Sequence, residues 1–383
     1  MARTNSTNFT GANQYPMASA GTDIFKKEDV QTLAKSVDLH NHSAGLGLPV
    51  DTTAIPAGAL NGSKLTDGTV TSAKIQDGTI VAADVADASL TNAKLGSDVA
   101  RANLLTNGGF EIWQRGNGPF TANNAYAADR WQIVLIGNDT VSVTRAAGLG
   151  PGQYAASVTT THGTGNVLLQ QILRASDTGL LGQTVTFSVM VWSPNTAPIV
   201  AINRDGTGGG QVNGNTHTGG STWQKLSVTA AIPADATSVT LFVAFNVSAG
   251  YLMDNAMLVV GSQAADYVPL HPADDLARCL RYYEVIASNS GVIATAQALS
   301  ATQFQAMLRF RTYKAVTPTL TQGATQTLNA GGSPQAVTAT SVIYADIYGC
   351  GYNNTVASGL VAGNATNWSL ASSGQSIQAE ANP

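Results

Sequence analysis

Large aromatic side chains are the residues of this chain best suited to bind a neutral ligand. The C–H faces of a pyranose ring stack on tryptophan or tyrosine, and its hydroxyls pair with planar amide and carboxyl groups. Trp192 ends an alternating strand pattern and Trp223 opens another, which favours the core for both. Trp113 and Tyr126 lie beside Gly/Asn-rich loops, so these two, together with Trp131, are the candidate sugar platform. Nothing in the sequence identifies the sugar.

A second chemical candidate is the close histidine pair His40 and His42. Two imidazoles from one chain make a poor metal site. Three copies around a threefold axis would supply six imidazoles, enough for an octahedral transition metal. The alternative is a polar turn that precedes the repeats described below.

Catalytic motifs are missing from the sequence. No carboxylate pair stands at a spacing typical of glycoside hydrolysis, and no Gly-x-Ser-x-Gly elbow, phosphate loop or His-Glu-x-x-His occurs. The glycine run 206–210 lacks the Lys-Ser/Thr that would meet phosphates. We therefore expect a binding or structural protein and not an enzyme.

An aliphatic ladder with a period of five dominates residues 51–102. A small residue stands two positions before each aliphatic one, and a period of five is neither helical nor the alternation of a simple strand. It predicts a β-structure that turns a corner in every repeat, with too few coils to close alone. We expect a stalk shared by identical chains, most simply a homotrimer. The ladder consists of Leu60, Leu65, Val70, Ile75, Ile80, Val85, Leu90 and Leu95.

The rest of the chain predicts a mainly β protein. Residues 1–50 form an N-terminal attachment region, with an amphipathic helix over 26–37. Residues 103–270 alternate strands and turns, as in one jelly-roll β-sandwich. Residues 271–383 begin with a helix over 273–286 and continue as a smaller β-sandwich domain. Among the predicted strands are Gln132–Ile136, Thr140–Arg145, Val167–Leu173, Thr184–Trp192, Thr222–Ile232, Ser238–Asn246, Tyr251–Val260, Phe304–Tyr313 and Ser341–Tyr348.

Composition excludes several classes of protein. Charged residues make up 11% of the 383 residues and the net charge is −4, which is unlike a nucleic-acid binder. A hydrophobic content of 44% is unlike a disordered chain. We expect neither a signal peptide nor a membrane span, and two reduced thiols, Cys279 and Cys350, in a protein made in a cytoplasm.

Several segments resemble fibre proteins of tailed bacteriophages. The repeat lines KLTDGTVTSAKIQDGTIVAADV resemble phage stalk repeats, and three segments resemble carbohydrate-binding-module jelly rolls of phage tail proteins: NLLTNGGFEIW from Asn103, ADRW from Ala128 and YLMD from Tyr251. The stretch VGSQAADYVPL from Val260, followed by LARCLRYYE from Leu276, is similar to the junction that leads into the C-terminal domain of such fibres.

The resemblance implies a virion fibre or receptor-binding adhesin. Such a homotrimer would be made in the bacterial cytoplasm, attach to other phage proteins at its N-terminal end, and present domains for host-surface glycans on the particle exterior. Some phage fibres bind a metal through a His-x-His pair such as His40 and His42. Resembling jelly rolls also carry a structural calcium, whose ligands here would be Glu111 and Asp254, although Asn255 replaces the family's second acid. The alternatives are a structural capsid or baseplate fibre and a glycan-degrading spike.

Overall fold

A computed structural model describes most of the chain beyond the first repeats. The described residues are 65–86, 89, 102–150, 153–176, 178–288, 291–323, 326–330, 333–371 and 376–382. The chain divides into two compact units, Met1–Ala86 and Asp87–Pro383. The predicted helix over 26–37 and the histidine pair His40 and His42 lie outside the described residues.

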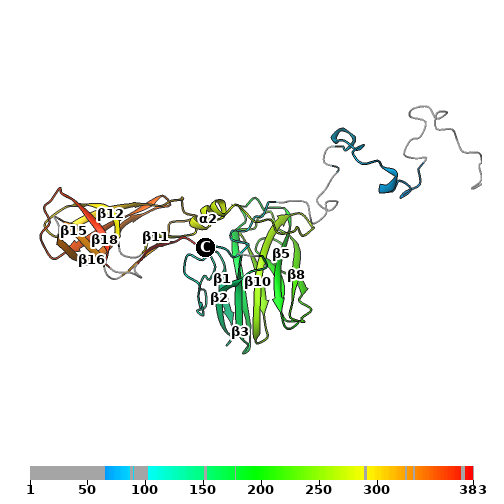
Figure 1. Ribbon diagram of the computed structural model, residues 1–383, viewed down its shortest axis with the longest axis horizontal. Coiled ribbons are helices and arrows are strands. Elements are labelled where there is room, and N and C mark those ends of the chain that lie inside the picture. The colour runs from blue at the N-terminus through cyan, green and yellow to red at the C-terminus, as the bar shows by residue number, and fades with distance from the viewer. Residues whose placement is uncertain are drawn as a thin grey trace, which may run out of the picture. The chain divides into compact units, whose positions relative to one another are not determined.

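The described part of the ladder, residues 65–86, contains turns and short 3-10 helices in place of the predicted strands. The 3-10 helix η3 spans Ser72–Lys74 and η4 spans Ala82–Asp84 (Figure 1). Gly68 and Gly78 have φ angles of 78° and 77°. A strand cannot continue through this left-handed conformation, and an Asp-Gly turn is formed at each position.

The turns recur every ten residues, although the aliphatic ladder recurs every five. The N–H of Thr69 donates to the Thr66 carbonyl at 3.1 Å. Ten residues later, the N–H of Thr79 donates to the Gln76 carbonyl at the same distance. In this single chain the large aliphatic side chains of residues 65–80 are 40–57% exposed, so the row that would form a core faces solvent.

Ten antiparallel strands form the β-sandwich predicted for residues 103–270. These strands are β1 Gln132–Ile136, β2 Thr140–Ala147, β3 Tyr154–Thr161, β4 Asn166–Arg174, β5 Thr184–Ser193, β6 Ile199–Arg204, β7 Gly210–Thr216, β8 Thr222–Ala231, β9 Ser238–Phe245 and β10 Ala249–Val260. One sheet has the order β1-β4-β9-β6-β7 and the other β2-β3-β10-β5-β8, which confirms the mainly β, jelly-roll-like class. Figure 1 labels the strands of the second sheet.

Alternating residues of the two sheets build the core between them. On β5, Val185, Phe187 and Val191 are fully buried. On β9 of the other sheet, Leu241 and Val243 are also fully buried. Because successive side chains of a strand point to opposite faces, the residues between them form the two outer faces.

Helix α2, Pro272–Leu280, follows the sandwich and is shorter than the predicted 273–286. His271 caps its N-terminus through Nδ1, which accepts the Ala273 N–H at 3.3 Å, and Pro272 occupies the first turn. Tyr283 and Ile286 belong instead to the strand Tyr283–Ser288, in which Tyr283 pairs with Glu380 and Ile286 lies at a register shift. Among the described residues, no helix is long and apolar enough to cross a membrane.

The C-terminal strands form a closed barrel and a small sheet in place of the predicted sandwich. Their bounds are β11 Tyr283–Ser288, β12 Gly291–Ala298, β13 Gln303–Arg309, β14 Thr319–Gln322, β15 Gln326–Ala330, β16 Ser333–Ala345, β17 Gly349–Val356, β18 Ala365–Leu370 and β19 Ser376–Glu380. The barrel order is β12-β13-β17-β16-β15-β18, and β11-β19-β14 form the sheet. Phe304, Tyr352 and Trp368 fill the barrel, and Cys279 and Cys350 are buried without a disulfide.

Candidate functional site

The predicted platform residues Trp113 and Trp131 lie in the core of the sandwich. Trp113 is 7% exposed, its Nε1–H donates to the Phe110 carbonyl, and its ring stacks on Phe120 at 6.3 Å between centroids. Trp131 is fully buried and donates its Nε1–H to the Asn107 carbonyl at 2.9 Å. Neither ring has the exposure that a sugar platform needs, because Phe110 stacks on Trp131 and Phe120 stacks on Trp113.

The other three aromatic residues considered from the sequence, Tyr126, Trp192 and Trp223, are half-buried. Tyr126 is half-buried beneath Arg115, whose Cζ lies 5.1 Å from the ring centroid, and burial raises the pKa of Tyr126. Trp192 and Trp223 are direct cross-strand partners on β5 and β8. Both are half-buried and belong to the outer face of their sheet, not to the core as their strand patterns suggested.

The outer face of the other sheet carries two parallel rows of side chains. Both rows follow directly paired residues across β1, β4, β9, β6 and β7. The first row has three amides around an apolar centre and consists of Gln132, Gln170, Phe242, Ala201 and Asn213. The aliphatic row consists of Val134, Leu168, Ala244, Ile199 and Thr216. Gln170 donates to Gln132 at 2.9 Å, and Phe242 is only 6% exposed, so the face has an apolar floor edged by amides.

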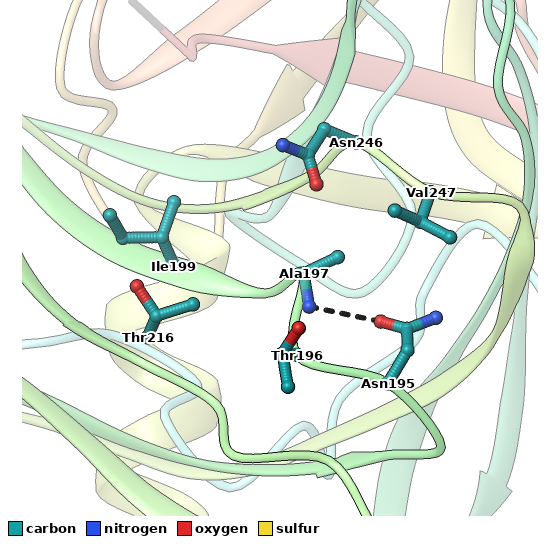
Figure 2. Close-up of a pocket in the computed structure, with 7 residues that line it drawn as sticks. All are labelled: Asn195, Thr196, Ala197, Ile199, Thr216, Asn246 and Val247. Atoms are coloured by element: carbon teal, nitrogen blue, oxygen red, sulfur yellow. Dashed lines mark hydrogen bonds between the residues drawn. The ribbon is translucent and has the colours of Figure 1, made fainter.

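A pocket of about 370 Å³ extends the aliphatic row beyond Ile199 and Thr216. It lies where the loop after β5 and the turn after β9 meet the ends of β6 and β7. Figure 2 shows the lining residues around one space: Asn195, Thr196, Ala197, Ile199, Thr216, Asn246 and Val247. The lining has two amides, two hydroxyls and three aliphatic side chains, and contains no ionisable group and no aromatic ring.

One wall of the pocket is held by hydrogen bonds around Asn195. Its Oδ1 accepts the Ala197 N–H at 3.0 Å (Figure 2), and its Nδ2 donates to the Tyr251 hydroxyl at 3.2 Å. The Tyr251 hydroxyl in turn donates to the Val247 carbonyl at 2.8 Å. Tyr251 is 1% exposed, so both loops are fixed to the sandwich core by one buried side chain. The pocket is therefore preorganised.

Other polar groups of the pocket are available to a ligand. The side chains of Thr196, Thr216 and Asn246 are exposed and form no hydrogen bond with the described residues. An amide and two hydroxyls can each donate and accept. Sequence reasoning missed all of these residues, and the only available signal was that Asn195 and Asn246 closely follow strongly alternating strands.

The structure brings the predicted calcium ligands Glu111 and Asp254 together. The segment before Glu111 pairs with β10, where the Leu104 N–H donates to the Leu258 carbonyl at 3.0 Å. A register shift in β10 lies between Asp254 and Met257, and the Ala256 N–H at this shift donates to the Gly108 carbonyl of the segment at 2.8 Å. Burial raises the pKa of Asp254 to about 6, the N–H groups of neighbouring residues oppose that shift, and the Glu111 charge adds to it.

This carboxylate pair fits a hard cation. Glu111 accepts the Tyr154 N–H at 3.0 Å and Asp254 accepts the Leu149 N–H at 2.8 Å, but neither forms an ion pair with Lys or Arg among the described residues. Burial also raises the pKa of Glu111. Calcium prefers such oxygen ligands, and carbonyls would have to complete its shell. The described residues contain no cluster of three or more His, Cys, Asp or Glu for a metal.

Comparisons with known proteins give distant likenesses only. No family model and no curated protein matches the chain. A tailspike protein 4 enzymatically active domain from bacteriophage CBA120 is similar at 12% identity and a TM-score of 0.30, over 42% of this chain and 21% of that one. The chain thus spans about a fifth of that tailspike structure.

Two carbohydrate-binding modules have comparable values. The CBM22-1 xylan-binding domain from Paenibacillus barcinonensis is similar at 19% identity and a TM-score of 0.29, over 43% of this chain and 98% of that domain. The module TmCBM61, in complex with β-1,4-galactotriose, is similar at 16% identity and 0.29, over 42% and 99%. These values are too low to transfer a ligand or an activity to this chain.

Proposed function

We propose that this protein is a virion fibre of a tailed bacteriophage that binds a neutral glycan on the host surface. The observation that carries the binding proposal is the pocket beside Ile199, which combines amides, hydroxyls and aliphatic groups without any ionisable side chain. Neutral sugars need donors, acceptors and apolar contact in one concave site. A charged ligand would find no counter-ion there.

Asn246 provides the sharpest test of glycan binding. Replacing Asn246 by Ala removes one free amide without touching the core, and we expect the affinity for a bound glycan to fall about tenfold, the loss of one or two ligand hydrogen bonds. The full chain is screened on a glycan array, and Kd is then measured for both proteins. Asn138→Ala, in the exposed turn between β1 and β2, is the matched control. Unchanged affinity in Asn246→Ala would remove the pocket as the site.

Three chains would cover the exposed aliphatic ladder. The side chains of Leu65, Val70, Ile75 and Ile80 are 40–57% exposed in one chain, and sister chains can bury them around a common axis. Three weak glycan sites would then act with avidity. Native mass spectrometry of the full chain tests this assembly, and a stable monomer at micromolar concentration would contradict it. Elemental analysis of the same sample tests a transition metal at His40 and His42.

Calcium at Glu111 and Asp254 would serve stability in this proposal. The two carboxylates would hold the ion with backbone carbonyls and so tie the N-terminal segment of the sandwich to the register shift of β10. The ion would supply positive charge that offsets the repulsion between the two buried acids. Backbone hydrogen bonds of the protein itself would hold the N-terminal segment and β10 in register.

A structural fibre is the second candidate function, and the barrel favours it. Val292, Met307, Tyr348 and Val361 are 54–64% exposed, which suits contact with neighbouring virion proteins. A protein that assembles on particles yet binds no glycan and no host cells would support this role. We propose a binding protein on the virion exterior and not an enzyme, and release of oligosaccharides from host polysaccharide would contradict that part.

A further inference from the structure

The apolar side of the pocket is aliphatic, and this restricts the sugars that suit it. Ile199 is half-buried and Val247 is 41% exposed, and with Ala197 they provide the pocket's apolar surface. The nearest aromatic ring in the network, Tyr251, is 1% exposed and packs on Phe245 at 4.7 Å. A pyranose C–H face therefore has no ring to stack on in this pocket.

The geometry suits a ligand with a methyl group next to a carbonyl. Small branched side chains such as Ile199 and Val247 contact a methyl group well. The C–H face of a sugar ring needs instead the flat surface of an aromatic ring. Asn246 lies on the same pocket and offers both a donor and an acceptor (Figure 2). Its Nδ2–H can donate to an acetyl carbonyl, and its Oδ1 can accept an acetamido N–H.

We infer that the pocket binds the acetyl group of a neutral acetylated sugar. This inference rests on the proposed glycan-binding function and narrows it to one ligand class. The acetyl group has two chemical sources, an acetamido group and an acetate ester. Both present the methyl and the carbonyl, and only the acetamido group adds the N–H. Acidic sugars are excluded from the class because the lining has no cation.

The test compares matched methyl glycosides with the full-length protein. The probes are methyl N-acetylglucosaminide, methyl N-acetylgalactosaminide, mono-O-acetylated methyl glucoside and galactoside, and the two unacetylated parents. We expect acetylated probes to bind at least about tenfold more tightly than their parents, the discrimination that one apolar group in a fitted pocket can give. In saturation-transfer NMR, the acetyl methyl should receive the largest transfer. The relative affinity of the N- and O-acetylated probes decides between the two sources.

A conservative variant checks that the contact is made by this pocket. Val247→Thr keeps the shape of an exposed side chain and replaces one methyl by a hydroxyl. It should cut the ratio of the affinity for acetylated probes to that for their parents at least about threefold, since a buried methyl contact is worth about 0.8 kcal/mol. Equal binding of acetylated and parent sugars by the unmodified protein would overturn the inference and leave the proposed function standing. Absence of binding to every neutral glycan would remove both.

Discussion

At the scale of single residues, protonation and metal binding compete at the Asp254 carboxyl, and they change the pH dependence of the fold's stability in opposite directions. Its pKa rises from 3.8 to about 6 because the side chain is buried and Glu111 lies nearby. The folded state therefore binds this proton more tightly than the unfolded state. Without a metal, this group stabilises the fold as the pH falls from about 6 toward 4 and destabilises it above that range.

We predict that calcium reverses this pH dependence. At pH 7 the ionised pair Glu111 and Asp254 can bind the ion, so millimolar calcium should raise the unfolding temperature, and the gain should vanish as the pH falls through about 6. Asp254→Asn should remove both the gain and this group's share of the pH dependence, whereas Asp266→Asn, an exposed partner of Lys225, should keep both. Scanning calorimetry with calcium or with chelator measures these effects. A calcium effect that survives in Asp254→Asn would place the ion elsewhere.

Lys314 and Glu284 form an ion pair whose side chains are 0% and 1% exposed, with 2.5 Å between Nζ and Oε2. The same Nζ also donates to the Leu280 carbonyl at 2.6 Å, which joins the end of α2 to the pair. Lys314→Met leaves the buried Glu284 carboxylate with the Arg311 N–H and the Arg311 guanidinium, whose Nε lies 3.6 Å from Oε1. We predict a loss of about 3 kcal/mol in the free energy of unfolding. The double variant Lys314→Met/Glu284→Leu should recover much of that loss in denaturant titrations. Equal losses in the single and double variants would show that the charge is not the cause.

At the scale of elements, alternation predicted the strands that have one buried face. The pattern gave β1 as Gln132–Ile136, and it placed β5 within one residue of its end. It missed β7, Gly210–Thr216, because glycine and asparagine there have low strand propensity and the strand is fixed by pairing with β6. The pocket could not be predicted, because its residues come from three separate segments that only the folded sandwich brings together.

The repeat segment allows a prediction about its structural period. Turns and 3-10 helices recur every ten residues, so deleting residues 67–76 joins Thr66 to Asp77 and keeps the Asp-Gly turn. Deleting residues 67–71 keeps the aliphatic spacing of five but removes one turn. We expect the first variant to retain the number of chains in the proposed trimer and its melting temperature, and the second to lower both. Native mass spectrometry and thermal melting distinguish them, and equal behaviour would mean that five residues form the repeat.

At the scale of the whole molecule, two arginines of the sandwich bind the C-terminal strands. The Cζ of Arg115 lies 3.5 Å from the ring centroid of Tyr283, and its Nη2 bonds Glu380 on the last strand. Arg130 lies in the same way over Tyr282, at 3.8 Å. The sequence motif Arg-Tyr-Tyr-Glu at residues 281–284 is part of the resemblance to phage fibres, and its physical role is to supply these two rings. Its partners, 150 to 170 residues away, could not be read from spacing.

This junction should make the sandwich and the barrel unfold together. Removing the Arg115 side chain exposes the Tyr283 ring and leaves Glu380 without its cation, a loss of stacking and charge pairing in a partly buried place. We predict that calorimetry of Arg115→Ala resolves two transitions where the unmodified chain gives one, and that Tyr283→Leu does the same from the other side. Arg145→Ala is the matched control, because Arg145 stacks on Tyr154 at 4.1 Å inside the sandwich. It should lower the melting temperature slightly and keep a single transition. A single transition in both Arg115→Ala and Tyr283→Leu would show that the two β-domains are coupled by other contacts.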